Sequence, residues 1–195
     1  MSAIGVVAPR GTASGIPSGK LAIWWFLASE TMTFGGLLGV FVLFRYAAGG
    51  WHEPAAHLHV WLAATNTLVL LTSSYTMVRA HAAETAEDRR ATQRWLFVTM
   101  GLGLAFLAIK AVEYASEWRA GFTPRSSLFW GFYYGLTGLH AAHVLGGVIA
   151  LVALGIALAR GRAWGAVRQR VEYVGLYWHF VDIVWIFLFP LVYLS

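Results

Sequence analysis

The stretch Gly175-Leu-Tyr-Trp-His-Phe-Val-Asp-Ile-Val-Trp185 decides the fold of this chain. It places His179 and Asp182 in the middle of the last of several long apolar runs. An aspartate near the centre of a bilayer costs roughly 2.5–3.5 kcal/mol on insertion scales, so it needs a polar environment. Residues three apart share one face of a helix. We therefore expect His179 and Asp182 to face protein, water or a partner rather than lipid.

Composition indicates that the whole chain is a membrane protein. Of its 195 residues, 58% are hydrophobic and 12% are charged, whereas soluble domains carry about 25% charged residues. Cysteine is absent, which excludes disulfides and thiolate metal sites. The net charge of +5 does not indicate nucleic-acid binding, because the basic residues lie in short clusters between the apolar runs.

Five apolar runs reach the length of about 20 residues that spans a bilayer. The predicted fold is all-α: a polytopic membrane protein with five transmembrane helices in a bundle, over residues 21–44, 58–78, 95–118, 127–159 and 171–194. The fourth run is over-long, so its helix should be tilted or project into water. Residues 1–20 are predicted to be a flexible N-terminal tail, and residues 21–195 one transmembrane domain.

Basic residues predict the orientation of this bundle. With five spans, one side of the membrane collects ten basic residues and the other collects three. The positive-inside rule then places the N-terminus in the cytoplasm and the C-terminus outside. Two glycine pairs, Gly35 with Gly39 and Gly131 with Gly135, have the GxxxG spacing that lets helices pack closely in lipid. We interpret them, together with Gly146 and Gly147, as packing positions within the bundle rather than as places where a cofactor approaches.

Four polar side chains join Asp182 at a similar depth when a rise of about 1.5 Å per residue is counted along each run. They are Glu30 in the first run, His140 and His143 in the fourth, and His179 in the fifth. This common depth predicts one intramembrane polar network between three helices. Glu30 has no neighbouring base in the sequence and is the best candidate for a direct role, in proton uptake.

Each of the other polar groups has a structural interpretation beside a functional one. His140 and His143 are spaced like metal ligands on a helix, but no third ligand is evident, so hydrogen bonds to carboxylates or backbone are preferred. His179 and Asp182 either relay protons or clamp two helices together. Lys110 and Glu113, also three residues apart, either form a local ion pair that softens their burial or take part in ion transfer.

Several segments together resemble subunit III of the haem-copper oxidases. Residues 177–185, Tyr-Trp-His-Phe-Val-Asp-Ile-Val-Trp, resemble the closing signature of that family. Residues 132–144 resemble its Thr-Gly-x-His-x-x-His-Val element, and residues 25–30 resemble the helix that carries the family's carbodiimide-reactive glutamate. Residues 66–74 and 113–114 also fall where the family has similar segments. The resemblance covers nearly the whole chain from about residue 20.

The resemblance implies a non-catalytic accessory subunit of a proton-pumping terminal oxidase in aerobic respiration, a cytochrome c or quinol oxidase that reduces oxygen to water. Haem and copper would lie in partner subunits, with no metal on this chain, and phospholipid would bind here. The chain would pack directly on subunit I, support its stability and proton uptake, and neighbour subunit II and a small subunit IV. The membrane would be a bacterial-type cytoplasmic (inner) membrane.

Matching positions imply that Glu30 is the family's buried glutamate. The family's intramembrane polar framework would be His140, His143, His179 and Asp182. Separately from the resemblance, Arg160 and Arg162 are basic loop residues that we expect to meet lipid phosphates at the cytoplasmic surface.

The chain departs from the family pattern in two respects. Longer members have seven helices, with two before the equivalent of residues 21–44. Lys110 stands where many members have an uncharged residue, and forms associated with nitric oxide reductases can carry a lysine there. An accessory subunit of a nitric oxide reductase is therefore the nearest alternative. An autonomous membrane transporter is an alternative of another class, disfavoured because five helices make no symmetric halves.

Overall fold

The computed structural model describes residues 15, 17–51, 55, 57–160 and 164–194. Five long helices dominate this part of the chain: α1 (Ser18–Ala47), α3 (Val60–Thr85), α4 (Arg89–Arg119), α5 (Leu128–Ala159) and α6 (Trp164–Tyr193). The prediction of an all-α chain with five long helices is confirmed. Most of the helices extend beyond the predicted apolar runs, because helical structure continues into polar turns beyond the hydrophobic stretch.

Four of these helices, α1, α4, α5 and α6, are long and apolar enough to cross a membrane. Helix α3 has 26 residues and is long enough, but hydroxyl and amide side chains interrupt its apolar run. Many of these hydroxyls donate to carbonyls of the preceding turn, as Thr67 does to the carbonyl oxygen of Ala63 at 2.8 Å. Such hydroxyls are satisfied inside their own helix and make it less polar than its sequence indicates.

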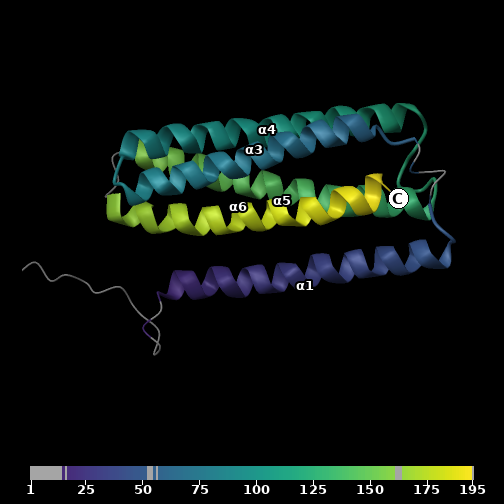
Figure 1. Ribbon diagram of the computed structural model, residues 1–195, viewed down its shortest axis with the longest axis horizontal. Coiled ribbons are helices and arrows are strands. Elements are labelled where there is room, and N and C mark those ends of the chain that lie inside the picture. The colour runs from purple at the N-terminus through teal and green to yellow at the C-terminus, as the bar shows by residue number, and fades with distance from the viewer. Residues whose placement is uncertain (1–14, 16, 52–54, 56, 161–163, 195) are drawn as a thin grey trace, which may run out of the picture.

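Helices α3 to α6 form a bundle, and α1 lies along one side of it (Figure 1). The buried side chains of α1 are Leu27, Phe34 and Phe41, which are seven residues apart. A seven-residue repeat keeps one narrow stripe of a helix against its neighbours. α1 therefore touches the bundle, mainly α6, along a single seam, and most of its remaining surface is not covered by this chain.

Side-chain contacts fix the register of the antiparallel helices α3 and α6. The Ser74 hydroxyl lies 2.8 Å from Nδ1 of His179, and the indole Nε1 of Trp185 donates to the hydroxyl of Thr67 at 2.9 Å. The two contacts are about two turns apart on each helix. Thr67 and Ser74 of α3 therefore face α6, and Trp178, Asp182 and Trp185 of the stretch 175–185 are buried inside the bundle.

Of the glycines predicted to pack helices together, Gly146 and Gly147 lie against Tyr177 and Trp178 of α6, whereas the GxxxG pairs do not pack closely. A Cβ at Gly35, Gly39 or Gly135 would meet nothing within 4 Å, and at Gly131 it would meet only the backbone oxygen of Pro124, at 3.3 Å. Within the described residues, these pairs therefore mediate no close helix packing. Glycine spacing alone does not show which face of a helix is turned inward. In α1 the inward face is the stripe formed by Leu27, Phe34 and Phe41.

Candidate functional site

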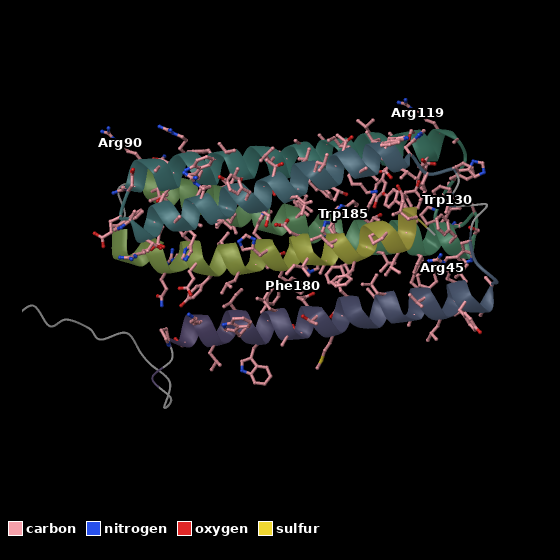
Figure 2. All side chains as sticks on the ribbon, viewed as in Figure 1. Arg45, Arg90, Arg119, Trp130, Phe180 and Trp185 are labelled. Atoms are coloured by element: carbon pink, nitrogen blue, oxygen red, sulfur yellow. The ribbon has the colours of Figure 1, made fainter. Side chains whose placement is uncertain are left out.

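The buried polar side chains lie around two tryptophans of α6. Trp178 and Trp185 are each 1% exposed. The indole Nε1 of Trp178 donates to the hydroxyl of Ser73 on α3 at 3.1 Å. The ring of Trp185 lies 5.0 Å from that of Phe106 on α4, in an edge-to-face arrangement. Figure 2 labels Trp185 within the bundle and Phe180 on the side of α6 that faces α1.

Glu30 and His143 form a polar contact between α1 and α5. Nε2 of His143 lies 3.1 Å from Oε2 of Glu30, and the two side chains are 15% and 18% exposed. Nδ1 of His143 lies 2.8 Å from the carbonyl oxygen of Leu139. The ring is packed edge-on against Phe34 with centroids 5.0 Å apart. The seam of α1 therefore contains one carboxyl, and α5 supplies its partner.

The number of protons on this pair follows from its geometry. A carbonyl oxygen only accepts, so Nδ1 of His143 carries a hydrogen and donates it to Leu139. If the ring is neutral, Nε2 accepts and Glu30 must supply the proton. If the ring is an imidazolium, Nε2 donates to the carboxylate of Glu30. In both cases the two groups share one proton across the 3.1 Å contact.

Lys110 and Glu113 lie on α4, in the half of that helix nearer to Arg119, and they contact side chains of α5 and α6. Their side chains are 2% and 0% exposed, and Nζ of Lys110 donates to Oε2 of Glu113 at 3.1 Å. Nζ also donates to the hydroxyl of Tyr133 at 3.3 Å and to that of Tyr193. Both tyrosines in turn donate to Oε1 of Glu113, at 2.8 and 2.6 Å. All three N–H groups of the Lys110 ammonium and both carboxylate oxygens of Glu113 are therefore hydrogen-bonded.

Four aromatic rings surround the ammonium of Lys110. Nζ lies 4.8–5.8 Å from the ring centroids of Tyr114, Tyr133, Trp185 and Tyr193. The negative faces of such rings attract a cation that has left water. The rings and the carboxylate together compensate a buried charge that would otherwise be costly. This arrangement accords with the ion-pair interpretation of Lys110 and Glu113.

His179 and Asp182 lie on one side of α6 but do not bond directly. Nδ1 of His179 lies 4.0 Å from Oδ2 of Asp182, which is longer than a hydrogen bond. Asp182 is 3% exposed, and neither of its oxygens has a hydrogen-bond partner among the described residues. His179 is half-buried and contacts Ser74 instead. Among the described residues His179 contacts α3 through Ser74, and a clamp between the fourth and fifth helices stays a prediction.

His140 stands apart from the other polar groups. It is fully buried beside the rings of Trp185 and Phe106, at centroid distances of 4.9 and 5.5 Å, and neither nitrogen has a hydrogen-bond partner in the described part of the chain. The expected single network is thus divided, and the physical reason is rotation about the helix axis. Residues three apart point about 60° apart, because each residue turns the helix by about 100°. His143 therefore reaches α1 while His140 points into the bundle.

Some participants were not predicted from the sequence. Tyr133, Tyr193 and Ser74 complete the polar contacts, yet no local spacing links them to Lys110 or His179. The aromatic richness of residues 132–134 was the only signal for the first of these. Of the predicted lipid head-group residues, Arg160 is exposed at the end of α5, whereas Arg162 lies outside the described residues.

Basic residues mark the two ends of the bundle. Figure 2 shows Arg90 at one end, and Arg45 and Arg119 at the opposite end. Arg168 lies at the Arg90 end, where it bonds to Glu84 at 2.5 Å. The arrangement matches the separation of charges on which the predicted orientation depends.

Comparison with known proteins gives a single family. The family model described as cytochrome c oxidase subunit III matches residues 13–195. The cytochrome c oxidase subunit 3 of Corynebacterium diphtheriae is 37% identical over 171 residues, which cover 86% of this chain and 83% of that protein. Proteins of the same name from Alkalihalophilus pseudofirmus and Thermostichus vulcanus are 34% and 29% identical, and the alignments cover at least 94% of each chain.

Proposed function

The chain belongs to the family of cytochrome c oxidase subunit III, and from this premise we propose that it supports subunit I of a proton-pumping haem-copper oxidase. It is a subunit of an oxidoreductase complex that contains other subunits. The observation that carries the proposal is the use of its buried polar groups. Lys110, Glu113 and His143 are engaged in polar contacts inside the bundle, whereas neither nitrogen of His140 has a hydrogen-bond partner among the described residues. From the family membership, haem, copper and oxygen reduction are proposed to belong to partner subunits.

A role in proton uptake is proposed for Glu30. Its carboxyl shares one proton with His143, and the pair is partly accessible at the edge of the α1 seam. When the pair passes its shared proton on, it is left as a carboxylate beside a neutral imidazole, and it becomes neutral again by taking up another proton. This property suits a group that helps to deliver protons to subunit I. The intramembrane polar groups His140, His179 and Asp182 are proposed as the framework around it.

Phospholipid binding is proposed for the hollow between α1 and α6. Its volume is about 400 Å³, and its walls are mainly apolar, with Leu27 and Trp24 from α1 and Phe180 and Ile183 from α6. Acyl chains fit an elongated apolar surface of this kind. Arg160 is proposed to meet lipid phosphates at the cytoplasmic surface, where basic side chains are attracted by anionic lipids.

The partner surface is proposed to include the outer side of α1. Gly35 and Gly39 leave that side without side chains, and Met32 beside them is 79% exposed. Small residues allow another transmembrane helix to approach closely. We expect a helix of subunit I there, with subunit II and a small subunit IV further away.

The full topology is also a proposal. We infer that α3 crosses the membrane with the other four helices, because it packs between α4 and α6 and carries hydroxyls that are satisfied internally. Five spans then place the N-terminus in the cytoplasm and the C-terminus outside, in a bacterial-type cytoplasmic (inner) membrane.

The supporting role is tested by replacing Glu30 in the assembled complex. We expect Glu30→Ala to leave the visible haem spectrum intact, while proton pumping falls and the oxidase inactivates sooner during turnover. Ser29→Ala is the matched control, because Ser29 is the neighbouring polar residue and its hydroxyl bonds only to the carbonyl of Phe26. If turnover, pumping and inactivation rate all match the control, Glu30 has only a structural role. Loss of the haem spectrum would instead indicate a role in assembly.

A further inference from the structure

Asp182 is a buried carboxyl whose hydrogen-bonding needs the described side chains do not fully meet. It is 3% exposed, and both of its oxygens lack a partner among the described residues. A buried polar atom without a hydrogen bond costs about 1–3 kcal/mol, and more when it is charged. The Ser74 hydroxyl, which also contacts His179, approaches this carboxyl but has a single hydrogen to donate, so a further donor must bond to the carboxyl. Water is the smallest molecule that can.

The distance between Asp182 and His179 fits one bridging water. Nδ1 of His179 is 4.0 Å from Oδ2 of Asp182. Polar atoms separated by more than about 3.5 Å are often joined by a water that bonds to both. The Ser74 hydroxyl, 2.8 Å from the same nitrogen, adds a third polar group at this point. A water here has the two or more polar partners that a buried water requires.

A hollow between α3 and α6 leads to His179. Its volume is about 200 Å³, and its lining includes His81 and Val78 on α3 and Glu172 and Leu176 on α6. Water in the liquid occupies about 30 Å³ per molecule, so the hollow holds several waters. It is lined by two titratable groups, His81 and Glu172, on the way to His179. Polar groups at these positions can hydrogen-bond the water that fills the hollow.

A second hollow, of about 460 Å³, continues the first toward the end of the bundle that carries Arg168. The two hollows share His81 and Glu172. At this mouth one cation faces two carboxylates, because Arg168 bonds to Glu84 at 2.5 Å and to Glu87 at 3.0 Å. Arg168 is therefore not free to bind a lipid phosphate. The wider hollow has a mainly polar lining that suits water, whereas Met77, Val78 and Leu176 make the walls of the narrower hollow mainly apolar.

We propose that these two hollows form one water-filled inlet along α6, which connects the cytoplasmic end of the bundle to a hydrated, proton-exchanging site at His179 and Asp182. The ligand is water, together with the protons it carries. At its inner end the inlet meets the apolar hollow on the α1 side of α6, because the first hollow shares Leu176 and His179 with it. The proposal does not depend on the supporting role in an oxidase, because it concerns only how water reaches this pair.

The other titratable groups near this pair are bonded to other partners or do not line the hollows, so the inlet ends at His179 and Asp182. Lys20 of α1 bonds to Glu172 at 2.9 Å, and Glu30 is held by His143. The neighbouring elements contribute, besides these, His81 and Glu84 on α3, Lys110 on α4 and His140 on α5. Lys110 is committed to Glu113, and Glu84 to Arg168. His140 is enclosed by rings and does not line either hollow.

The inlet is tested by cysteine labelling of the assembled complex in membrane vesicles. The chain has no cysteine of its own, so single substitutions give a clean signal. Val78→Cys places a thiol in the inlet, and Leu176→Cys places one where the inlet meets the apolar hollow. The matched control is Phe97→Cys on α4, because Val78 and Phe97 are 51% and 48% exposed and lie at one level, set by the 2.8 Å contact between Thr76 and Thr99. The probe is a charged methanethiosulfonate that does not cross membranes.

In inside-out vesicles we expect the two inlet thiols to react at least about tenfold faster than the control, because the reactive thiolate forms only where water solvates it. In right-side-out vesicles both should react slowly. Asp182→Cys extends the test to the end of the inlet and should also react from the inside. Equal, slow reaction of inlet and control thiols would overturn the proposal. Faster reaction from the outer side would overturn the cytoplasmic connection.

Discussion

The indole of Trp178 lies so close to Gly103 that a Cβ on that glycine would be 2.6 Å from the ring carbon Cη2. On α5, a Cβ at Gly147 would be 2.7 Å from Cε3 of the same ring. The ring therefore fills a space that two glycines leave between α4 and α5, while its Nε1 bonds to Ser73 on α3. One side chain of α6 thus sets the spacing of three other helices.

Replacing Gly103 by alanine should destabilise the bundle by about 1–3 kcal/mol, the usual cost of overpacking a close-packed interior. The measurement is the free energy of unfolding in mixed micelles. Gly101→Ala is the matched control, since Gly101 lies two residues earlier on α4 and its Cβ would meet nothing within 4 Å. The control should be stabilised by about 0.5–1 kcal/mol through helix propensity. Equal stability of the two variants would contradict the role given to the indole.

Lys110→Met should destabilise the chain by about 3–5 kcal/mol, because it leaves the buried carboxylate of Glu113 without its cation. Methionine has a similar length and no charge, so packing changes little. The double variant Lys110→Met with Glu113→Gln removes both charges and should cost less than the sum of the two single variants. Urea unfolding of all four proteins in micelles gives the coupling energy. Strict additivity would show that the two groups do not stabilise each other.

Glu30→Gln should change the free energy of unfolding far less than Glu30→Ala, which should cost about 1–3 kcal/mol. The amide of glutamine can still donate to Nε2 of a neutral His143, whereas alanine leaves that nitrogen without its partner. Thermal unfolding of the two variants distinguishes the two proton placements. If the glutamine variant is as damaged as the alanine variant, the ring of His143 is an imidazolium that needs a carboxylate.

The helices and some, but not all, of the polar contacts could be predicted from the sequence. Apolar runs predict helices because their length and composition are local properties, and Lys110 with Glu113 is predictable because residues three apart meet on one helix. Partners such as Tyr133 and Tyr193 depend on the register between helices, which no local spacing encodes. Depth along a helix can also be counted, whereas the direction of a side chain around its helix cannot be read from depth. His140 and His143 have different surroundings because their side chains point in different directions around α5.

The crossing of α3 predicts which side of the membrane its two ends reach. Tyr46, near the end of α1, is 87% exposed, and the side chain of Glu87, in the turn between α3 and α4, is 68% exposed. In a chain without native cysteine, Tyr46→Cys and Glu87→Cys should react with a membrane-impermeant reagent from opposite sides, the first from outside and the second from the cytoplasm. Arg119→Cys should react from the same side as position 46, because α4 returns the chain there. If positions 46 and 87 react from one side and position 119 from the other, α3 does not cross and the chain has four spans.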